Sequence, residues 1–197
     1  PYLIGMDAAH GHAMLRGRTV FPTSISMAAT FNRKLVQESA AKAAEEIRSA
    51  GTHWTFAPSV DIVQDARWGR TGETYGEDPF LASELVREAI TGLQGNLDPR
   101  KNVAATVKHL AGGGTSVGGV NHASAEVSER ALRSYILPPF QAAIEAGVLT
   151  VMPGHNDIAG IPAHASKWLL TDLVKQEYGF KGFYISDMGD VENLKSH

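Results

Sequence analysis

Five short apolar runs recur along the chain, and each is continuous rather than alternating. They span residues 2–6, 54–57, 103–107, 148–152 and 183–186. Continuous apolar runs of this length are typical of strands that are buried on both faces of a parallel sheet. The pattern therefore predicts five strands that run in the same direction.

Helical patterns fill the intervals between these runs, and their ends carry recognisable signals. Asn32 and the Asp78–Pro79 pair are suited to helix starts, whereas Gly51 and Gly179 follow the last periodic residue of a helix. Strands that alternate with helices predict βαβ units and a parallel sheet. The expected helices span 32–51, 78–95, 125–146 with a break at Pro138 and Pro139, and 166–179.

The number of units limits the architecture. A closed (β/α)8 barrel typically needs about 250 residues. This chain has 197 residues and about five βα units. The expected fold class is therefore α/β, either as a small open sheet or as a TIM-type barrel that is present only in part.

Composition excludes several function classes. The chain has 18 basic and 21 acidic side chains and a net charge of -3, with no basic run that would bind nucleic acid. No stretch approaches the roughly 20 apolar residues of a membrane span. There is no cysteine for disulfide or thiolate chemistry. No glycine-rich phosphate-binding motif follows a strand, so a nucleotide cofactor is not expected.

Polar side chains follow every predicted strand. Asp7, Arg67, the Lys108–His109 pair, His155 and Asp187 come after the five runs in turn. The carboxyl ends of parallel strands meet at one edge, where α/β proteins bind ligands. Cations beside a carboxylate keep it ionised, and an ionised carboxylate serves as a nucleophile or stabilises a cationic transition state. These residues predict one site for a substrate rich in hydroxyl groups.

Several short motifs occur in order along the chain, and the set covers nearly its whole length. They are Gly5–Gly11, Phe21–Pro22, Met27–Asn32, Ala57–Ile62, Arg67–Arg70 with Glu73–Pro79, Lys108–His109, Leu137–Phe140, Gly179–Gly182 and Ser186–Asp187. Each motif is weak alone, but together they resemble glycoside hydrolase family three, specifically its bacterial β-glucosidase branch.

The resemblance implies a (β/α)8-type domain that hydrolyses β-linked glucosides with retention and without a metal or organic cofactor. It implies that Asp187 is the nucleophile. By the same resemblance, Asp at position 7 favours a glucosidase, because xylosidases of the family more often carry Glu there. Met152 ends a strand, so packing is the alternative interpretation of that residue. The expected substrate-binding residues are Asp7, Arg67, Lys108, His109, His155 and Met152.

The resemblance also implies a second carboxyl group, which acts as the acid/base in retaining hydrolysis. In similar glucosidases a following domain supplies this Glu. We therefore expect residues 1–197 to be a partial catalytic barrel domain that needs its own C-terminal domain, and to be inactive or weakly active alone. A periplasmic or secreted bacterial location is favoured over the cytoplasm.

Several alternatives remain open at this stage. Within the family, a β-xylosidase or a β-N-acetylhexosaminidase is the alternative, although His122 lacks the Asp partner that the latter enzymes use. His10 and His12 offer a His-x-His motif that a Zn-dependent barrel hydrolase would place near Lys108 and Asp187. A non-catalytic sugar-binding fragment is the remaining class.

Overall fold

The computed structural model describes residues 2–196. Its five parallel strands follow one another in chain order. β1 (Gly5–Met6) pairs with β2 (Trp54–Thr55), and β3 (Thr106–Leu110), β4 (Thr150–Pro153) and β7 (Phe183–Tyr184) form a second group. Single parallel bridges from Trp54 to Ala104 and from Ser59 to Lys108 join the two groups. The result is a continuous arc of parallel strands.

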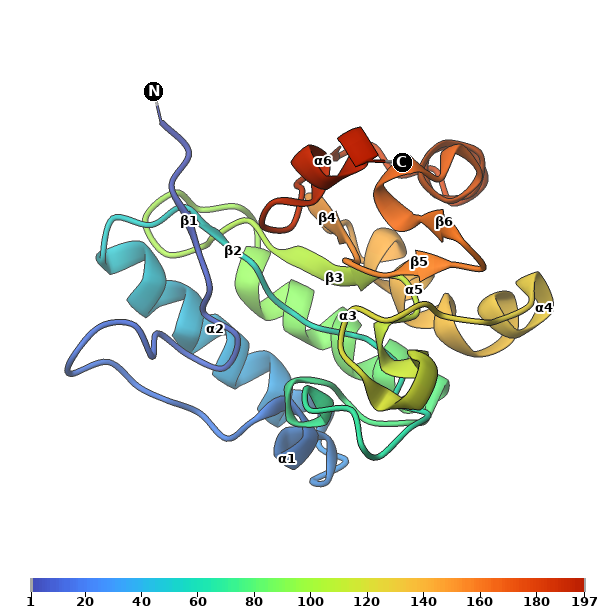
Figure 1. Ribbon diagram of the computed structural model, residues 1–197. Coiled ribbons are helices and arrows are strands. Elements are labelled where there is room, and N and C mark those ends of the chain that lie inside the picture. Colours follow the sequence, from blue (N-terminus) through green and yellow to red (C-terminus); the bar gives the residue numbers. More distant parts are fainter. Residues whose placement is uncertain (1, 197) are drawn as a thin grey trace.

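Two long helices, α2 (Arg33–Ser49) and α3 (Pro79–Gln94), pack side by side against this arc (Figure 1). The Asn32 side chain caps α2 by accepting from Leu35 N, and Asp78 caps α3 by accepting from Leu81 N. A Cβ at Gly92 would lie 2.4 Å from the carbonyl oxygen of Gln37 on α2. Glycine is required there because the two helices approach so closely.

The remaining elements are short, and most lie in the connections. A hairpin of two short antiparallel strands follows β4. The π-helical segment 168–177 covers the interval before β7. Their bounds are α1 Ser24–Ala28, η1 Thr71–Glu73, η2 Gly113–Thr115, η3 Val117–Gly119, α4 Glu129–Ala131, η4 Leu132–Ile136, α5 Pro138–Glu145, β5 Asp157–Ile158, β6 Ile161–Pro162, η5 Ala163–Ala165, η6 Trp168–Glu177, α6 Asp190–Asn193 and η7 Leu194–Ser196.

Buried polar side chains link the strands at their N-terminal ends. Trp54 Nε1 donates to the hydroxyl oxygens of Thr106 and Thr150, at 2.7 and 3.0 Å. Gln94, at the end of α3, accepts from Ala105 N and Leu149 N and donates to the Gly147 carbonyl oxygen. These bonds satisfy backbone groups that would otherwise be buried without partners.

The predicted α/β barrel architecture is confirmed, with local differences. β3 begins three residues later than the sequence pattern suggests, so Lys108 and His109 lie inside the strand rather than after it. The segment before α4 is not helical, because Ala125 pairs with Ile158 in the hairpin. In the part of the chain that the structure describes, no helix is long and apolar enough to cross a membrane.

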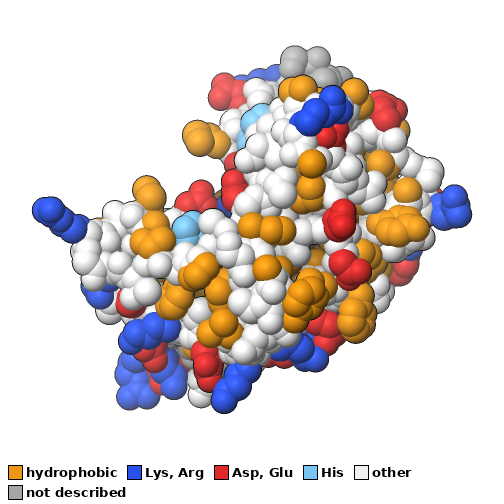
Figure 2. All heavy atoms as spheres, turned by 90° about the horizontal axis from the view of Figure 1, so that it is seen from below, with side chains coloured by type: hydrophobic (Ala, Val, Ile, Leu, Met, Phe, Trp, Pro, Cys, Tyr) orange, Lys and Arg blue, Asp and Glu red, His pale blue; other side chains and the backbone are white. Residues whose placement is uncertain are grey.

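The molecular surface carries no extended field of one charge on the face in Figure 2. Hydrophobic side chains lie across its centre, and basic and acidic side chains mix along one edge. This distribution agrees with the small net charge of -3.

Candidate active site

The first pair of site residues joins β1 to β3. Asp7 directly follows β1, and Lys108 lies within β3. Lys108 Nζ donates to Asp7 Oδ1 at 2.8 Å. The Lys108 side chain is 5% exposed, whereas that of Asp7 is 64% exposed. The buried ammonium thus holds a carboxylate that still faces solvent and can accept further hydrogen bonds from a ligand.

Next to Lys108, the His109 ring lies between a buried carboxylate and a guanidinium group. His109 Nδ1 is 2.9 Å from Asp61 Oδ2, which also accepts from the His109 backbone N–H. Arg70 Nη2 lies 3.2 Å from His109 Nε2. Because a carboxylate only accepts and a guanidinium only donates, this arrangement puts the ring proton on Nδ1 and leaves Nε2 as the acceptor.

Arg70 is itself held by a carboxylate. Its guanidinium makes two hydrogen bonds to Glu73, at 2.9 and 2.8 Å. This fork-to-fork geometry fixes the plane of the guanidinium and directs one of its nitrogens at His109. Both carboxylate oxygens of Glu73 are therefore hydrogen-bonded to Arg70.

Asp187 lies beyond the end of β7, beside this group. Its Oδ2 is 2.9 Å from His155 Nε2 and 3.8 Å from His109 Nε2, and its Oδ1 accepts from Met188 N at 2.7 Å. The Asp187 side chain is 19% exposed. It is therefore a fixed carboxylate with imidazole groups on one side and a path to solvent.

Burial and neighbouring charges shift the pKa values of two side chains at this site, Asp61 and His122. Burial alone would raise the pKa of Asp61, but the interactions with His109 and the charge of Arg70 lower it below its ordinary value. Burial, followed by the charges of His155 and Arg70, lowers the pKa of His122, whose ring lies 4.0 Å from that of His155 between centroids. Asp61 is thus held ionised and His122 neutral.

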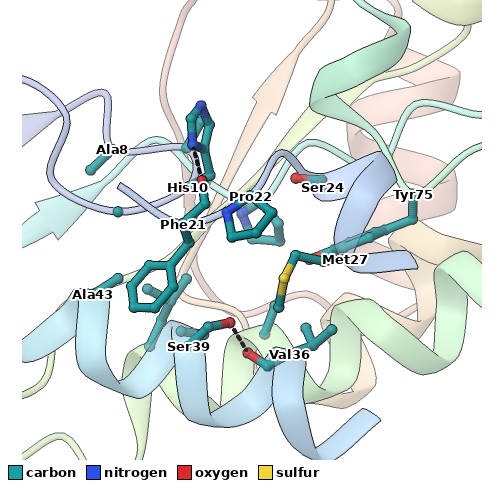
Figure 3. A pocket seen from close by; sticks show the side chains of 17 residues that line it. Ala8, His10, Phe21, Pro22, Ser24, Met27, Val36, Ser39, Ala43 and Tyr75 are labelled. Carbon is teal, nitrogen blue, oxygen red and sulfur yellow. Dashed lines mark hydrogen bonds between the residues drawn. The ribbon is translucent and has the colours of Figure 1, made fainter. Parts of the chain in front are cut away.

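A small cavity lies next to these side chains. It measures about 10 Å³, and its lining includes Arg70, His109, His122 and His155 but not Asp187, Asp7 or Lys108. A separate cavity of about 60 Å³ lies where the loop after β1 meets α2 (Figure 3). Apolar groups such as Phe21, Met27 and Val36 line it, and it contains none of the residues around Asp187. The candidate site is therefore the group of polar side chains around Asp187, next to the smaller cavity.

These observations can be compared with known proteins. The sequence profile of the Glycosyl hydrolase family 3 N terminal domain matches residues 1–197. The chain belongs to glycoside hydrolase family 3. It is 42% identical to a β-xylosidase of Formosa agariphila over 90% of this chain and 25% of that protein. It is 36% identical to the periplasmic β-glucosidase of Salmonella typhimurium over 100% of this chain and 25% of that protein.

Solved family 3 structures share the fold. The crystal structure of a β-glucosidase from Listeria innocua superimposes with a TM-score of 0.95 at 38% identity, covering 100% of this chain and 27% of that one. The same enzyme was also solved in complex with glucose. The chain spans about a quarter of the length of these relatives. The barrel fold inferred from the family resemblance is thus shown.

The structure does not bring every predicted family 3 site residue to the cluster. Arg67 points away from it: its side chain is 73% exposed and pairs with Asp65 at 2.6 Å. Trp68, the next residue, is buried and donates to Asn121 Oδ1. Met152 is 5% exposed within β4, where it pairs in register with Lys108.

The histidines proposed for a zinc site also lie elsewhere. His10 Nδ1 donates to the carbonyl oxygen of Phe21 at 2.8 Å, and His12 is fully buried. Neither histidine has a contact with Asp187. Among residues 2–196, no three His, Asp or Glu side chains come together in a way that suits a metal ion.

Three polar residues that the structure places in this group were not among the predicted site residues. Arg70 lies beside His109, whereas the sequence predicted Arg67 as the substrate-binding arginine. Asp61 Oδ2 lies 2.9 Å from His109 Nδ1, and Asp190 Oδ1 lies 2.7 Å from His155 Nδ1. Asp190 follows Asp187 by three residues, and this spacing was the one sequence signal that it lies at the same strand end.

Proposed function

We propose that the protein is a retaining β-glycosidase that acts on terminal β-D-glucosides and uses Asp187 as its nucleophile. The observation that carries the proposal is the position of Asp187 beyond β7, 2.9 Å from the His155 ring and beside His109. Hydrogen-bond donors and positive charge stabilise an ionised carboxylate, which is the form that attacks an anomeric carbon.

The surrounding polar groups suit the hydroxyls of one sugar ring. Lys108 and Arg70 donate, the exposed carboxylate of Asp7 accepts, and the His109 ring stands between them. Charge-assisted hydrogen bonds of this kind are stronger than neutral ones. In this proposal Arg70 replaces Arg67 as the sugar-binding arginine, His155 supports Asp187, and Met152 packs beneath the site.

The reaction proceeds in two displacements. An oxygen of Asp187 bonds to the anomeric carbon while the bond from that carbon to the leaving-group oxygen breaks. The leaving-group oxygen takes a proton from an acid. Water then attacks the same carbon and gives a proton to the conjugate base. This second step releases glucose with retained configuration and restores the carboxylate of Asp187.

The acid/base is proposed to come from a domain outside this chain. The carboxyl groups near Asp187 already have partners: Glu73 is bound to Arg70, Asp61 lies beneath His109, and Asp7 pairs with Lys108. The relatives are about four times as long as the chain, which leaves room for such a domain.

A β-xyloside is the second candidate substrate, because the Formosa agariphila relative at 42% identity is a β-xylosidase. Steady-state hydrolysis of 4-nitrophenyl β-glucoside and β-xyloside by the full-length protein compares the two. The glucoside should have the higher kcat/KM, NMR should detect the β-anomer of glucose first, and Asp187→Asn should abolish turnover. An α-anomer as the first product, or full activity of that variant, would refute the proposal.

A further inference from the structure

A line of side chains leads away from Asp187 into the protein. His155 Nε2 lies 2.9 Å from Asp187 Oδ2, and His155 Nδ1 lies 2.7 Å from Asp190 Oδ1. His164 Nδ1 follows, 3.3 Å from Asp190 Oδ2. Asp190 is 7% exposed, so this carboxylate faces the His155 ring in a site with little water.

Three separate segments build this line. Asp187 and Asp190 belong to the turn after β7 and to the start of α6, where Asp190 N donates to the Asp187 carbonyl oxygen at 3.3 Å. His155 follows β4, and His164 lies in η5. The arrangement therefore depends on tertiary packing between the ends of β4 and β7, not on one local motif.

The donors and acceptors determine the charge of the central ring. Carboxylates only accept hydrogen bonds, and His155 faces one with each ring nitrogen. A neutral imidazole has one proton, so its second nitrogen would direct a lone pair at a carboxylate oxygen. Two ionised carboxylates at these distances therefore require a doubly protonated, cationic His155.

We propose that Asp190 is a positioning residue that acts through His155: it holds this ring as the cation that orients the Asp187 carboxylate and keeps it ionised. The proposal rests on the assignment of Asp187 as the nucleophile. A buried carboxylate behind a histidine fixes the ring orientation and proton positions. The same cation stabilises Asp187 as the leaving group in the second displacement.

The first test is Asp190→Asn in the full-length protein, with 2,4-dinitrophenyl β-glucoside as the substrate. The Asn side chain keeps the size of Asp but removes the charge. Residue 190 then no longer stabilises the cationic form of His155. We expect kcat to fall by roughly 10- to 100-fold, as for other residues that support a reacting group. Competitive inhibition by glucose should change by less than about threefold, because the sugar-binding groups stay in place.

Glu192→Gln is the matched control. Glu192 lies on the same short helix, its side chain is 80% exposed, and the substitution removes the same unit of charge. It should leave kcat unchanged. An equal loss of kcat in both variants would show a general charge effect and overturn the proposal.

A double-mutant cycle with His155→Gln separates positioning from a general effect on folding. If Asp190 acts through His155, Asp190→Asn has no further effect on kcat once His155 is Gln. Additive losses would contradict the proposal. Nitrogen NMR of the ring gives a readout without turnover: both ring nitrogens of His155 should carry a proton at pH 7 in the wild type, and one should lose it in Asp190→Asn. A neutral wild-type ring would overturn the proposal.

The rate of labelling by 2-deoxy-2-fluoro-β-glucosyl fluoride distinguishes failure of the proposed function from failure of the positioning role of Asp190. If the wild type is not labelled on Asp187, the proposed function fails. If the wild type is labelled on Asp187 and Asp190→Asn is labelled equally fast, the function stands and the positioning role of Asp190 is refuted. Slower labelling of the variant, at the same residue, supports both.

Discussion

Lys108 Nζ lies 2.8 Å from Asp7 Oδ1, and this ion pair joins two strands whose residues are 101 positions apart in the sequence. The lysine is almost fully buried, whereas the carboxylate remains accessible. A buried cation that holds an exposed carboxylate in one orientation prepares it to accept hydrogen bonds from sugar hydroxyls without reordering. In the proposed function, the length of this carboxylate side chain influences which sugar fits.

Asp7→Glu tests the link between this side chain and sugar preference. One extra methylene moves the carboxylate toward the space that the hydroxymethyl group of glucose would fill, and xylose lacks this group. The ratio of kcat/KM for β-xyloside over β-glucoside should rise by about tenfold. Steady-state assays with both 4-nitrophenyl substrates measure this ratio. The surface variant Asp172→Glu is the control, and an unchanged ratio in Asp7→Glu would contradict the account.

Arg70→Gln and Arg67→Gln compare two arginines of the same loop. Arg70 faces His109, whereas Arg67 is solvent-exposed and bound to Asp65. We expect kcat/KM to fall by about 100-fold or more in Arg70→Gln and by less than about threefold in Arg67→Gln. The reverse order would show that the arginine exposed in this structure is the one that contacts the sugar.

Stability at acidic pH should depend on Asp61. Its pKa is lowered in the folded state relative to about 3.9 in an unfolded chain. A lowered folded-state pKa stabilises the fold above the unfolded value, and that contribution is lost as pH falls through the folded-state pKa. Melting temperatures between pH 2.5 and 6 should therefore decline on the acid side, and less steeply in Asp61→Asn. Parallel curves of melting temperature against pH for the wild type and Asp61→Asn would show that Asp61 does not cause the decline at acidic pH.

Gln94 should be among the more sensitive core positions. Its side chain makes three hydrogen bonds to the backbone around the starts of β3 and β4. Gln94→Ala leaves these buried groups without partners, so the free energy of unfolding should fall by about 3 kcal/mol. The exposed Gln141→Ala should change it by less than about 0.5 kcal/mol. Urea unfolding of both variants measures the difference, and a neutral Gln94→Ala would contradict this role.

The sequence predicted the fold because strand and helix signals are local. Asn32 and Asp78 begin helices through their own side chains, and polar residues after parallel strands must meet at one edge. The positions of side chains within loops were not predictable in this way. Arg67 and Arg70 lie three residues apart in one loop, and nothing in their spacing tells which one turns toward His109.

Contacts between segments far apart in the chain could not be predicted from the sequence either. The pairing of His155 with Asp190 depends on how the segments after β4 and β7 pack, 35 residues apart. The predicted strand 103–107 begins before β3 because the apolar run starts at Val103. It also ends before β3 does, because the charge of Lys108 resembles a strand end. In the fold, Asp7 and Asp61 satisfy Lys108 and His109, so the strand continues through both residues.

The most direct test of Asp187 as the nucleophile is intact-mass and peptide mapping after incubation with 2-deoxy-2-fluoro-β-glucosyl fluoride. This reagent carries its own leaving group, so labelling depends little on an acid from another domain. We expect one fluoroglucosyl adduct, located on Asp187 and absent from Asp187→Asn. An adduct on a different carboxylate, or no adduct on folded full-length protein, would contradict the assignment of Asp187 as the nucleophile.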